Sequence, residues 1–591
     1  MNKINMKRIN IVLGALAVAF SLTSCNDALN VKNPNNQTTY DFGNTESDLQ
    51  EAVIACYNRI RLEGTFARVG YTLDAVRGDE VWNSSQQWYL EYDNLNSPGT
   101  IDIGDQWIWR DNFHVVNRCN YVLSKIDDAN LSTNAYNEIK GQVLFLRALA
   151  YYSLATYYQT VPLFVDYSQY SALETMYASN ATQDEIFDQI DADLTEAMSI
   201  LPSRNNGGEW AKGRATCGAA AGYLSRSLMF RHKYAEAYAV LKDIIAGKYG
   251  TYGLMADYGA NFKEGAEFEN NMESLFEVQY LDYGMGGPDD EWTPVNISPN
   301  ASQGHAVESN YASQALGSWG DLAMSPWLYN LFKAERCTDG TLDPRLYWTA
   351  VTYEPEYSTY TGLKTAAYPS GDPRSNIVYM SEITETPLSN NAQGGISIAK
   401  FTNARNNIYS SITTGLKCGI NLRLMRYSDV LLRAAECENE LNGPTQTAID
   451  YINQVRERVA LPKLQLADFG SADKLFEQIA NVERPKEFGC ENGRGIDIIR
   501  WGFFYDSARL EQLKQHGSYL RNGTASTEEL TTATADDSSY NYYQKGHEYF
   551  PIFQSTLDAN PNLTGNSANK NHDNGEEFLA KWSVRPVVSL K

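Results

Sequence analysis

The sequence predicts a mainly α-helical fold in which pairs of helices form a scaffold and long loop-rich insertions interrupt it. Apolar residues recur at steps of three and four over residues 138–158, which is the spacing of one helix face. These positions are Ile139, Val143, Leu146, Ala150 and Leu154. Residues 183–201 repeat the spacing and are followed by Pro202, which has no amide hydrogen to continue a helix. We expect the two segments to form a helical hairpin.

Two further helical pairs are predicted, at residues 215–246 and from Met425 to about residue 459. The first pair begins with a segment dense in Ala and Gly, which allows close backbone approach. It turns at His232-Lys233 and ends before Gly247, a residue suited to a helix C-cap. The second pair breaks at Gly443-Pro444. Each resembles a tetratricopeptide unit, but the irregular separation of the pairs excludes an uninterrupted solenoid.

A long insertion, residues 247–419, separates these pairs. It contains YLDYGMGGPDDEWTPVNISPN and SNYASQALGSWGD, in which Gly, Pro, Asn and Asp stand between aromatic residues, as is typical of exposed loops. Residues 79–109 have the same character. Because loops on a rigid frame often carry binding residues, both regions are candidates for a contact surface.

The N-terminus has the pattern of a secretory signal. Lys3, Lys7 and Arg8 precede INIVLGALAVAF, an apolar stretch too short to span a bilayer. The next segment, LTSC, looks like a bacterial lipobox, so we expect residues 1–24 to be removed and Cys25 to carry lipid. An ordinary signal peptide with an incidental Cys is the alternative. Residues 25–44, rich in Asn, would form a flexible tether before a folded body that starts near Thr45.

Composition narrows the possible partners and cofactors. The chain has 49 Lys and Arg against 72 Asp and Glu, a net charge of −23, which disfavours nucleic acid and anionic membrane faces because they need clustered cations. The cysteines after Cys25 include no C-x-x-C pair, the six His include no H-E-x-x-H, and no calcium-loop motif occurs. We therefore predict no metal site of these recognised types, no cofactor and few or no disulfides. The abundant carboxylates leave the binding of a structural cation open.

Seven segments, taken in chain order, carry a resemblance to a known family. They are EIKGQVLFLRALAYYSLATYYQTVPLF, DEIFDQIDADLTEAMSILP, GRATCGAAAGYLSRSLMF, ENNMESLFEVQY, MRYSDVLLRAAECENELNG, AIDYINQVRERV and ERPKEFGCENGRGIDIIRWG. They resemble the SusD/RagB-like outer-membrane lipoproteins of Bacteroidetes over nearly the whole chain. The resemblance implies a SusD-like fold, with an N-terminal helical part at residues 45–246 and a C-terminal part at residues 247–591 that contains a ligand-binding insertion.

The resemblance also implies a function. Such proteins bind a nutrient, usually an oligo- or polysaccharide and less often a peptide, and deliver it to a SusC-like TonB-dependent transporter. The lipoprotein would act as a lid over the transporter barrel. It would be lipid-anchored in the outer membrane, facing the exterior, and would do no bond chemistry.

A sugar-binding surface needs aromatic faces for the CH side of a pyranose and polar neighbours for its hydroxyl groups. The resemblance implies that this surface draws on the early loop region and the central insertion, where exposed-looking aromatic residues concentrate. The candidate ligand-binding residues are Asp79, Trp82, Asn83, Trp88 and Tyr89 from the first region and Tyr283, Trp292 and Trp319 from the second. For any one Trp, packing beneath its loop is an equally good interpretation.

Two acidic groups invite a catalytic interpretation. Asp289-Asp290-Glu291 are adjacent in a Gly-Pro loop, whereas a glycosidase needs an acid and a base on either side of the bond. A second series has the three- and four-residue spacings of ion pairs along a helix, and predicts a lattice that locks the C-terminal part to the repeats. Its members are Glu483, Arg484, Glu487, Glu491, Arg494, Asp497 and Arg500.

Phosphate-loop and nucleophile-elbow motifs are also missing from the sequence. We therefore predict a binding protein rather than an enzyme. Two alternatives remain open: a surface glycoside hydrolase, and a scaffold whose helical pairs hold a protein partner.

Overall fold

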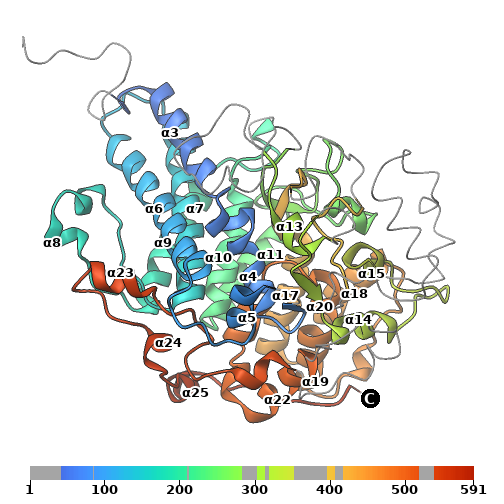
Figure 1. The fold of residues 1–591 in the computed structure, drawn as a ribbon. Coiled ribbons are helices and arrows are strands. Elements are labelled where there is room, and N and C mark those ends of the chain that lie inside the picture. The colour runs from blue at the N-terminus through green and yellow to red at the C-terminus, as the bar shows by residue number, and fades with distance from the viewer. Residues whose placement is uncertain are drawn as a thin grey trace, which may run out of the picture.

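The computed structural model describes residues 42–83, 86–208, 212–281, 303–312, 318–351, 396–405, 417–517 and 538–590 (Figure 1). The predicted signal, Cys25 and most of the tether lie outside the described residues. The first described helix, α3 (Glu46–Arg59), has Thr45 as its N-cap residue. The Thr45 side chain accepts a hydrogen bond from the Asp48 amide, and the Asp48 carboxylate accepts one from the Thr45 amide. This reciprocal cap fixes the start of the helix.

Eight helices of the described chain form a continuous row in which each packs against the next (Figure 1). They are α3, α6 (Trp107–Lys125), α7 (Thr133–Tyr158), α9 (Gln183–Ile200), α10 (Cys217–Phe230), α11 (Tyr234–Ile245), α17 (Tyr427–Asn442) and α18 (Gln446–Arg458). The predicted hairpin is α7 with α9, and the predicted pairs are α10 with α11 and α17 with α18. The mainly α-helical prediction is confirmed.

The row continues from α11 to α17 because the insertion between them is closed at its base. Strand β2 (Ser274–Val278) pairs antiparallel with β4 (Leu422–Arg426), and α17 begins at the next residue after β4. The chain that leaves after β2 therefore returns beside it. Long loops whose ends meet in this way are tolerated because closure entropy grows only slowly with length.

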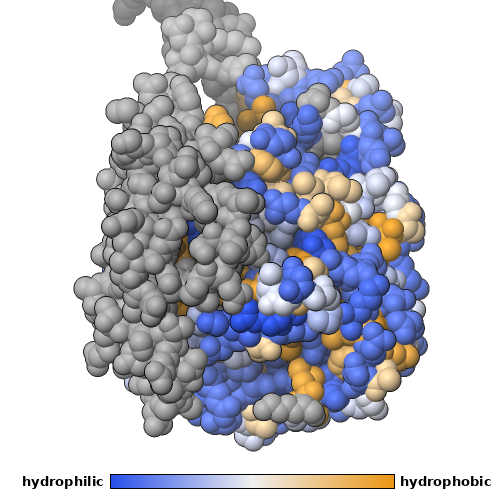
Figure 2. All heavy atoms as spheres, turned by 90° about the vertical axis from the view of Figure 1, so that its right-hand side faces the viewer, coloured by the Kyte–Doolittle hydropathy of each residue, from blue (hydrophilic) through white to orange (hydrophobic). Residues whose placement is uncertain are grey.

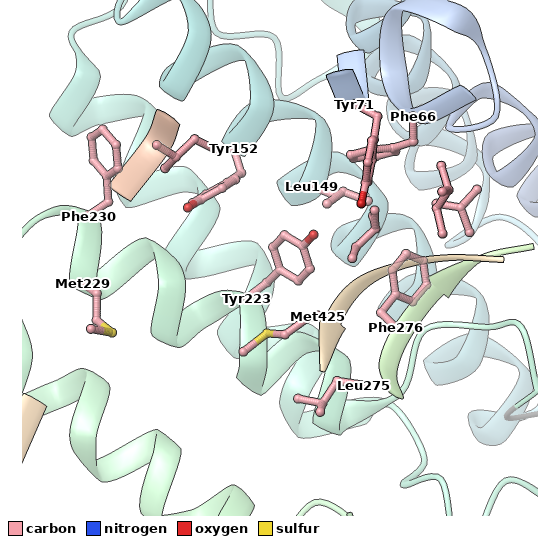
Figure 3. Packing of buried hydrophobic residues seen from close by; sticks show 14 of the residues in the cluster. Phe66, Tyr71, Leu149, Tyr152, Tyr223, Met229, Phe230, Leu275, Phe276 and Met425 are labelled. Carbon is pink, nitrogen blue, oxygen red and sulfur yellow. The ribbon is translucent and has the colours of Figure 1, made fainter. Parts of the chain in front are cut away.

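The short sheet lies directly on α10 at Gly222, a position without a side chain. A Cβ atom at Gly222 would lie 2.6 Å from Met425 Sδ, too close to be accommodated without a shift. Met425 and Leu275 lie below Tyr223 of α10 in this region, and Phe276 lies to the right of them (Figure 3). The Ala- and Gly-rich composition of α10 thus allows the close approach that the sequence predicted, and this contact joins the insertion to the central core.

The remaining described elements are short and flank the row. In the N-terminal half they are η1 (Glu63–Ala67), α4 (Val69–Val76), β1 (Val81–Asn83), α5 (Gln87–Asp93), η2 (Asp102–Gln106), η3 (Tyr167–Tyr170) and α8 (Leu173–Met176). In the insertion they are η5 (Tyr258–Phe262), α13 (Val307–Tyr311), β3 (Leu322–Met324), α14 (Pro326–Lys333) and α15 (Pro344–Thr349).

The C-terminal elements pack across the repeats (Figure 1). They are η9 (Leu466–Asp468), α19 (Ala472–Gln478), η10 (Ile479–Glu483), α20 (Arg484–Phe488), α21 (Arg494–Arg500), η11 (Phe503–Tyr505), α22 (Ser507–His516), η14 (Ser539–Tyr542), α23 (Gln554–Ala559), α24 (Ser567–Lys570) and α25 (Gly575–Lys581). None of the described helices is long and apolar enough to cross a membrane. The seven cysteines of the described residues are all buried and free.

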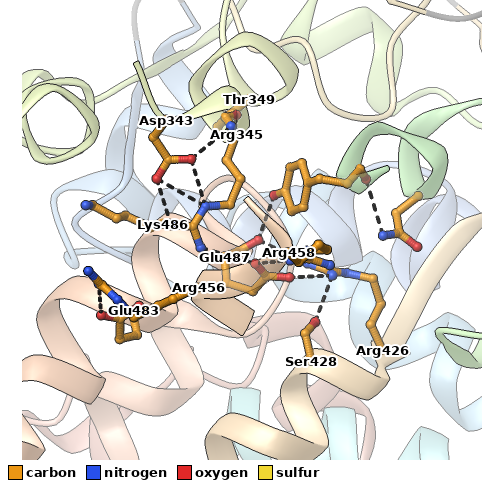
Figure 4. Close-up of polar contacts among 12 residues, drawn as sticks. Asp343, Arg345, Thr349, Arg426, Ser428, Arg456, Arg458, Glu483, Lys486 and Glu487 are labelled. Carbon is orange, nitrogen blue, oxygen red and sulfur yellow. Dashed lines mark hydrogen bonds and ion pairs between the residues drawn. The ribbon is translucent and has the colours of Figure 1, made fainter. Parts of the chain in front are cut away.

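Arg426, at the end of β4, is the centre of a buried group of ion pairs that we call the Arg426 cluster (Figure 4). One guanidinium nitrogen, Nη1, contacts Glu273 at 2.6 Å and Glu487 at 2.8 Å. The other, Nη2, contacts Glu491 at 2.7 Å. Because Glu273 precedes β2 and the other two residues follow η10, one side chain joins the base of the insertion to the C-terminal part.

Glu487 has further cationic partners in this cluster. It lies 2.5 Å from Arg458 of α18 and 3.3 Å from Arg345 of α15. Burial alone would raise the pKa of Glu487, but the guanidinium groups of Arg458, Arg426 and Arg345 hold it well below its usual range. Charges of both signs are therefore matched in a region without solvent, as a buried cluster requires.

A second group of buried ion pairs continues the lattice along α17 and α21. Asp429 lies 2.8 Å from Arg226 of α10 and 2.8 Å from Arg484, while Asp497 lies 2.6 Å from Arg484. Arg500 contacts Glu436 at 2.5 Å. The prediction that the charged series after residue 482 locks the C-terminal part to the repeats is confirmed.

Glu487→Gln tests the Arg426 cluster. The substitution leaves three buried guanidinium groups with one carboxylate fewer, so we expect the free energy of unfolding at pH 7 to fall by about 3–5 kcal/mol. Urea denaturation followed by circular dichroism measures the loss. The matched control is Asp243→Asn, which breaks the exposed 2.7 Å pair with Lys248 and should leave the urea midpoint unchanged. A midpoint for Glu487→Gln equal to that of the control would contradict the role of the cluster.

Glu80 gives a pH-dependent test of the neighbouring region. Its buried carboxylate accepts a hydrogen bond from the Cys490 amide, and burial raises its pKa from 4.5 to about 8. The folded state thus holds this proton more tightly than the unfolded chain. The resulting stabilisation is complete below pH 4.5 and is lost as the pH rises through about 8.

Glu80→Gln removes the ionisation while keeping an acceptor for the Cys490 amide. The variant should become more stable relative to the parent as the pH rises from 5 to 9. Half of the difference between the folded and unfolded pKa values of Glu80 already corresponds to about 2 kcal/mol in the free energy of unfolding. Thermal unfolding of both proteins across this range provides the measurement, and parallel pH profiles would contradict the assignment.

Candidate functional site

The two regions that the sequence singled out as binding loops meet in the structure. Strand β1 pairs antiparallel with β3, with Trp82 opposite Ala323. The amide of Ser325 also donates a hydrogen bond to the Glu80 carbonyl at 2.8 Å. The early loop and the central insertion therefore form one surface region, which we call the loop junction: the described residues of 61–68, 81–93 and 303–324.

The turn from β1 into α5 is held by its own polar groups. The Asn83 amide donates to the Asp93 carboxylate at 2.8 Å. The Asn83 side chain accepts from the Gln86 amide at 3.0 Å and donates to the Gln86 carbonyl at 2.8 Å. Asn83 is buried, so the structure gives it a role in shaping the turn. The turn fixes the direction of α5, which carries the next two aromatic candidates.

Trp88 and Tyr89 lie side by side on α5, with ring centroids 3.7 Å apart and planes inclined by 29°. Tyr89 is fully buried, and its hydroxyl contacts Thr72 Oγ1 at 2.7 Å and donates to Asn310 Oδ1 at 3.1 Å. Trp88 is only half-buried. Tyr89 thus supports Trp88 from beneath and connects α5 to the insertion.

Trp319 comes to the same junction from the insertion. Its amide donates to the Ser309 carbonyl at 2.9 Å, and the Arg68 guanidinium lies over its ring at 5.3 Å. Arg68 is itself buried and contacts Glu63 at 2.5 Å. Trp319 is half-buried, like Trp88. The two indole rings are therefore partly open to solvent, on supports that are fixed by buried contacts.

The loop that carries Tyr283 and Trp292 lies outside the described residues, but its ends are placed. The Leu281 amide donates to the Gln303 carbonyl at 3.2 Å, and Arg61 contacts that same carbonyl at 3.0 Å. The Ala306 amide donates to Ala67 at 2.8 Å. Both ends of this loop therefore meet at η1, next to the arginine that holds Trp319.

Four candidates do not have the exposure that the sequence predicted. Asp79, Trp82, Asn83 and Tyr89 are 0%, 6%, 8% and 0% exposed. Asp79 pairs with both sides of the Arg494 guanidinium, at 2.6 and 2.7 Å, and with His516 at 2.8 Å. Burial would raise its pKa, but Arg494 and His516 hold it well below its usual range. Asp79 anchors α21 to the N-terminal half, and none of these four buried residues is placed among the ligand contacts.

Two features of the junction escaped sequence analysis. Residues 63–67 form a π-helix, a conformation often found at functional sites. Arg68, which follows it, was given no role because its partner Trp319 is distant in sequence. A basic residue in an apolar stretch is the only signal the sequence offered, and it does not identify a partner.

The chemistry of the described junction is that of a contact surface. It offers partly exposed indole faces on which a ligand can stack, while the Asn83 and Arg68 side chains beside them are buried and bonded within the protein. Groups of three or more His, Cys, Asp or Glu arranged to hold a metal ion do not occur among the described residues. The acidic run at residues 289–291 lies outside them.

Comparisons with known proteins agree with this architecture. SusD-like protein P25 of Formosa agariphila is 24% identical over 533 residues, covering 85% of this chain and 91% of that protein. A SusD superfamily protein of Bacteroides vulgatus superimposes with a TM-score of 0.67 at 25% identity, over 89% of this chain and 100% of that one. Surface glycan-binding protein A of Bacteroides thetaiotaomicron, in complex with laminarihexaose, gives 0.62 at 21% identity, over 88% and 99%.

Family models match both halves of the chain. The model described as starch-binding associating with outer membrane matches residues 27–229. The model of the SusD family matches residues 272–569, just over half of the sequence. The fold, the order of the helical pairs and these matches agree, and the chain belongs to the SusD family.

Proposed function

We propose that this protein is a cell-surface lipoprotein that binds an oligo- or polysaccharide at the loop junction and delivers it to a SusC-like TonB-dependent transporter. The half-buried indole rings of Trp88 and Trp319 carry the proposal. Buried contacts hold both rings in place, so they lose little conformational freedom when a sugar stacks on them. Tyr283 and Trp292 stay candidates on the loop whose ends lie at the junction.

The choice of a neutral ligand follows from the charges. The net charge of −23 disfavours anionic polymers, and the Arg68 guanidinium is neutralised by Glu63. On the face seen in Figure 2, the described residues are largely hydrophilic, with apolar residues scattered among them. A cationic peptide is the second candidate ligand, because the acidic surface would attract it. The laminarihexaose complex of a structural neighbour makes β-glucans a reasonable first choice of probe.

The proposed delivery step depends on the membrane anchor. Lipid on Cys25, followed by the Asn-rich tether, would keep the folded body at the membrane while leaving it free to rotate as a lid over a transporter. The proposal includes no bond chemistry. A glycoside hydrolase is the alternative, and the appearance of new reducing ends after incubation with polysaccharides would favour it.

Substitution of the two half-buried tryptophans tests the ligand surface. Trp88→Ala and Trp319→Ala should each weaken binding to the bound polysaccharide about tenfold, which corresponds to the loss of about 1.4 kcal/mol of stacking. Affinity electrophoresis in gels containing laminarin, starch or xylan measures the effect. Tyr136→Ala, at a half-buried aromatic residue of α7 away from the junction, is the control and should bind like the parent.

The same variants distinguish a ligand surface from a packed core. Their thermal midpoints should stay close to that of the parent. If stability and binding fall together in both variants, the rings are structural and the junction is not the site. Binding of cationic peptides but of no polysaccharide would favour the second candidate ligand.

Cys25→Ser tests the proposed anchor. In a Bacteroidetes host the parent should be found in the membrane fraction and should incorporate labelled fatty acid, whereas the variant should lose the label and become soluble after cell fractionation. Ser21→Ala changes a nearby polar residue without removing the thiol and serves as the control. A variant that stays labelled would exclude lipidation at this position.

A further inference from the structure

A pocket of about 380 Å³ lies between the N-terminal repeats and the C-terminal end of the chain. One wall comes from the residues after α7, the start of α9 and the end of α10, and the other from α21, η11 and α25. It shares no residue with the loop junction. Its volume falls in the lower part of the range of small-ligand sites, roughly 300–1,000 Å³. The pocket is therefore a separate site, suited to a small molecule.

The C-terminal wall presents a fixed aromatic group. Trp582 is half-buried, and His232 stacks on one face of its indole at 4.5 Å with an interplanar angle of 13°. Phe578 meets Trp582 at a centroid distance of 5.1 Å and Tyr505 at 5.0 Å. His232 Nε2 contacts the Arg500 carbonyl at 2.6 Å, and burial lowers the His232 pKa to about 4, so its ring is neutral at pH 7. The indole is thus held in position before any ligand arrives.

The opposite wall presents side-chain amides. Gln183 donates to the Ala155 carbonyl at 3.0 Å and to the Tyr549 hydroxyl at 3.3 Å, which orients its Oε1 as an acceptor. Gln159 donates to Asn574 Oδ1 at 3.4 Å. Neither glutamine Oε1 accepts a hydrogen bond from the residues that the structure describes. Both amide oxygens are therefore available to the hydroxyl groups of a ligand.

The backbone at Gln159 gives an independent sign of constraint. Its φ of 66° lies in the left-handed region, which costs free energy for a residue with a side chain. Such conformations persist only where the surroundings impose them, and they are common at ligand sites. Here the conformation ends α7 and places Gln159 at the pocket.

The charged groups of the pocket are already paired. Lys581 contacts Asp184 across the two walls at 3.4 Å, Arg500 contacts Glu436 at 2.5 Å, and Arg231 contacts Asp188 at 2.6 Å. A phosphate or carboxylate ligand would have to compete with these carboxylates. The lining thus favours a neutral ligand with an apolar face and several hydroxyl groups.

We propose that this pocket binds a mono- or disaccharide, stacked on Trp582 and hydrogen-bonded by Gln159 and Gln183, at a site separate from the polysaccharide surface. Because the ligand would touch both walls, its binding would hold the C-terminal end of the chain against the repeats. The proposal does not depend on the loop junction, since the two sites have no residue in common.

Saturation-transfer NMR on the full mature chain tests the proposal with glucose, galactose, maltose, cellobiose and laminaribiose as probes. At least one sugar should show transfer to its ring protons. Trp582→Ala should weaken that binding about tenfold. Thr160→Phe adds a large side chain to the N-terminal wall and leaves Trp582 unchanged. It should weaken binding as well, and it keeps the test valid should Trp582→Ala fail to fold. Trp319→Ala, at the loop junction, should leave the small-sugar signal unchanged.

The outcomes separate the two sites. Absence of transfer from all five sugars would overturn the pocket proposal. So would a signal that survives Thr160→Phe but is lost in Trp319→Ala, since it would then arise at the loop junction. If polysaccharide-containing gels retard both pocket variants as much as the parent, the proposed function stands whether or not the pocket binds a small sugar.

Discussion

Arg426 fixes how the insertion and the C-terminal part are placed on the helical repeats. This one residue lies where the insertion returns to the repeats, and its guanidinium contacts carboxylates from the base of the insertion and from the C-terminal part. A buried guanidinium without partners would be too costly to keep, so the fold is stable only when these segments are all in place. The directional contacts also fix their geometry, which apolar packing alone would leave less defined. The insertion can therefore be long and irregular while its base stays rigid.

The rigid base explains how loop residues can form a precise surface. β1 and β3 belong to loop regions far apart in sequence, and their pairing is supported on one side by the Glu80–Ser325 hydrogen bond and on the other by the Tyr89–Asn310 contact. Beneath them, Asp79 and Arg494 attach the N-terminal loop to α21. At the junction, Glu63 pairs with the Arg68 guanidinium that lies over Trp319.

The two proposed sites divide the molecule by ligand size. The loop junction is an open aromatic surface on which a polymer can lie, whereas the pocket beside Trp582 has room for one or two sugar rings. The pocket lies between the repeats and the last helix, two parts of the chain that are joined there by the exposed Lys581–Asp184 pair. A small sugar bound between them would add its contacts to those that already join these two parts, such as the hydrogen bond from Gln159 to Asn574.

The sequence by itself determined the helices of the three pairs, the ion-pair lattice after residue 482 and, from seven segments spread along the chain, the family. The helices and the lattice depend on local periodicity and on charge spacing, which can be observed within a short window. Pro485 lies in the first turn of α20, directly after the π-helix η10. The division of the chain at residue 246 stays a prediction.

Tertiary structure alone decided which aromatic and acidic residues are exposed. Asp79 is buried against Arg494, a residue 415 positions later in the chain. Tyr89 is buried against Asn310, which is 221 positions later. Such contacts leave no pattern near either residue, and the walls of the Trp582 pocket are likewise assembled from segments that only the folded chain brings together.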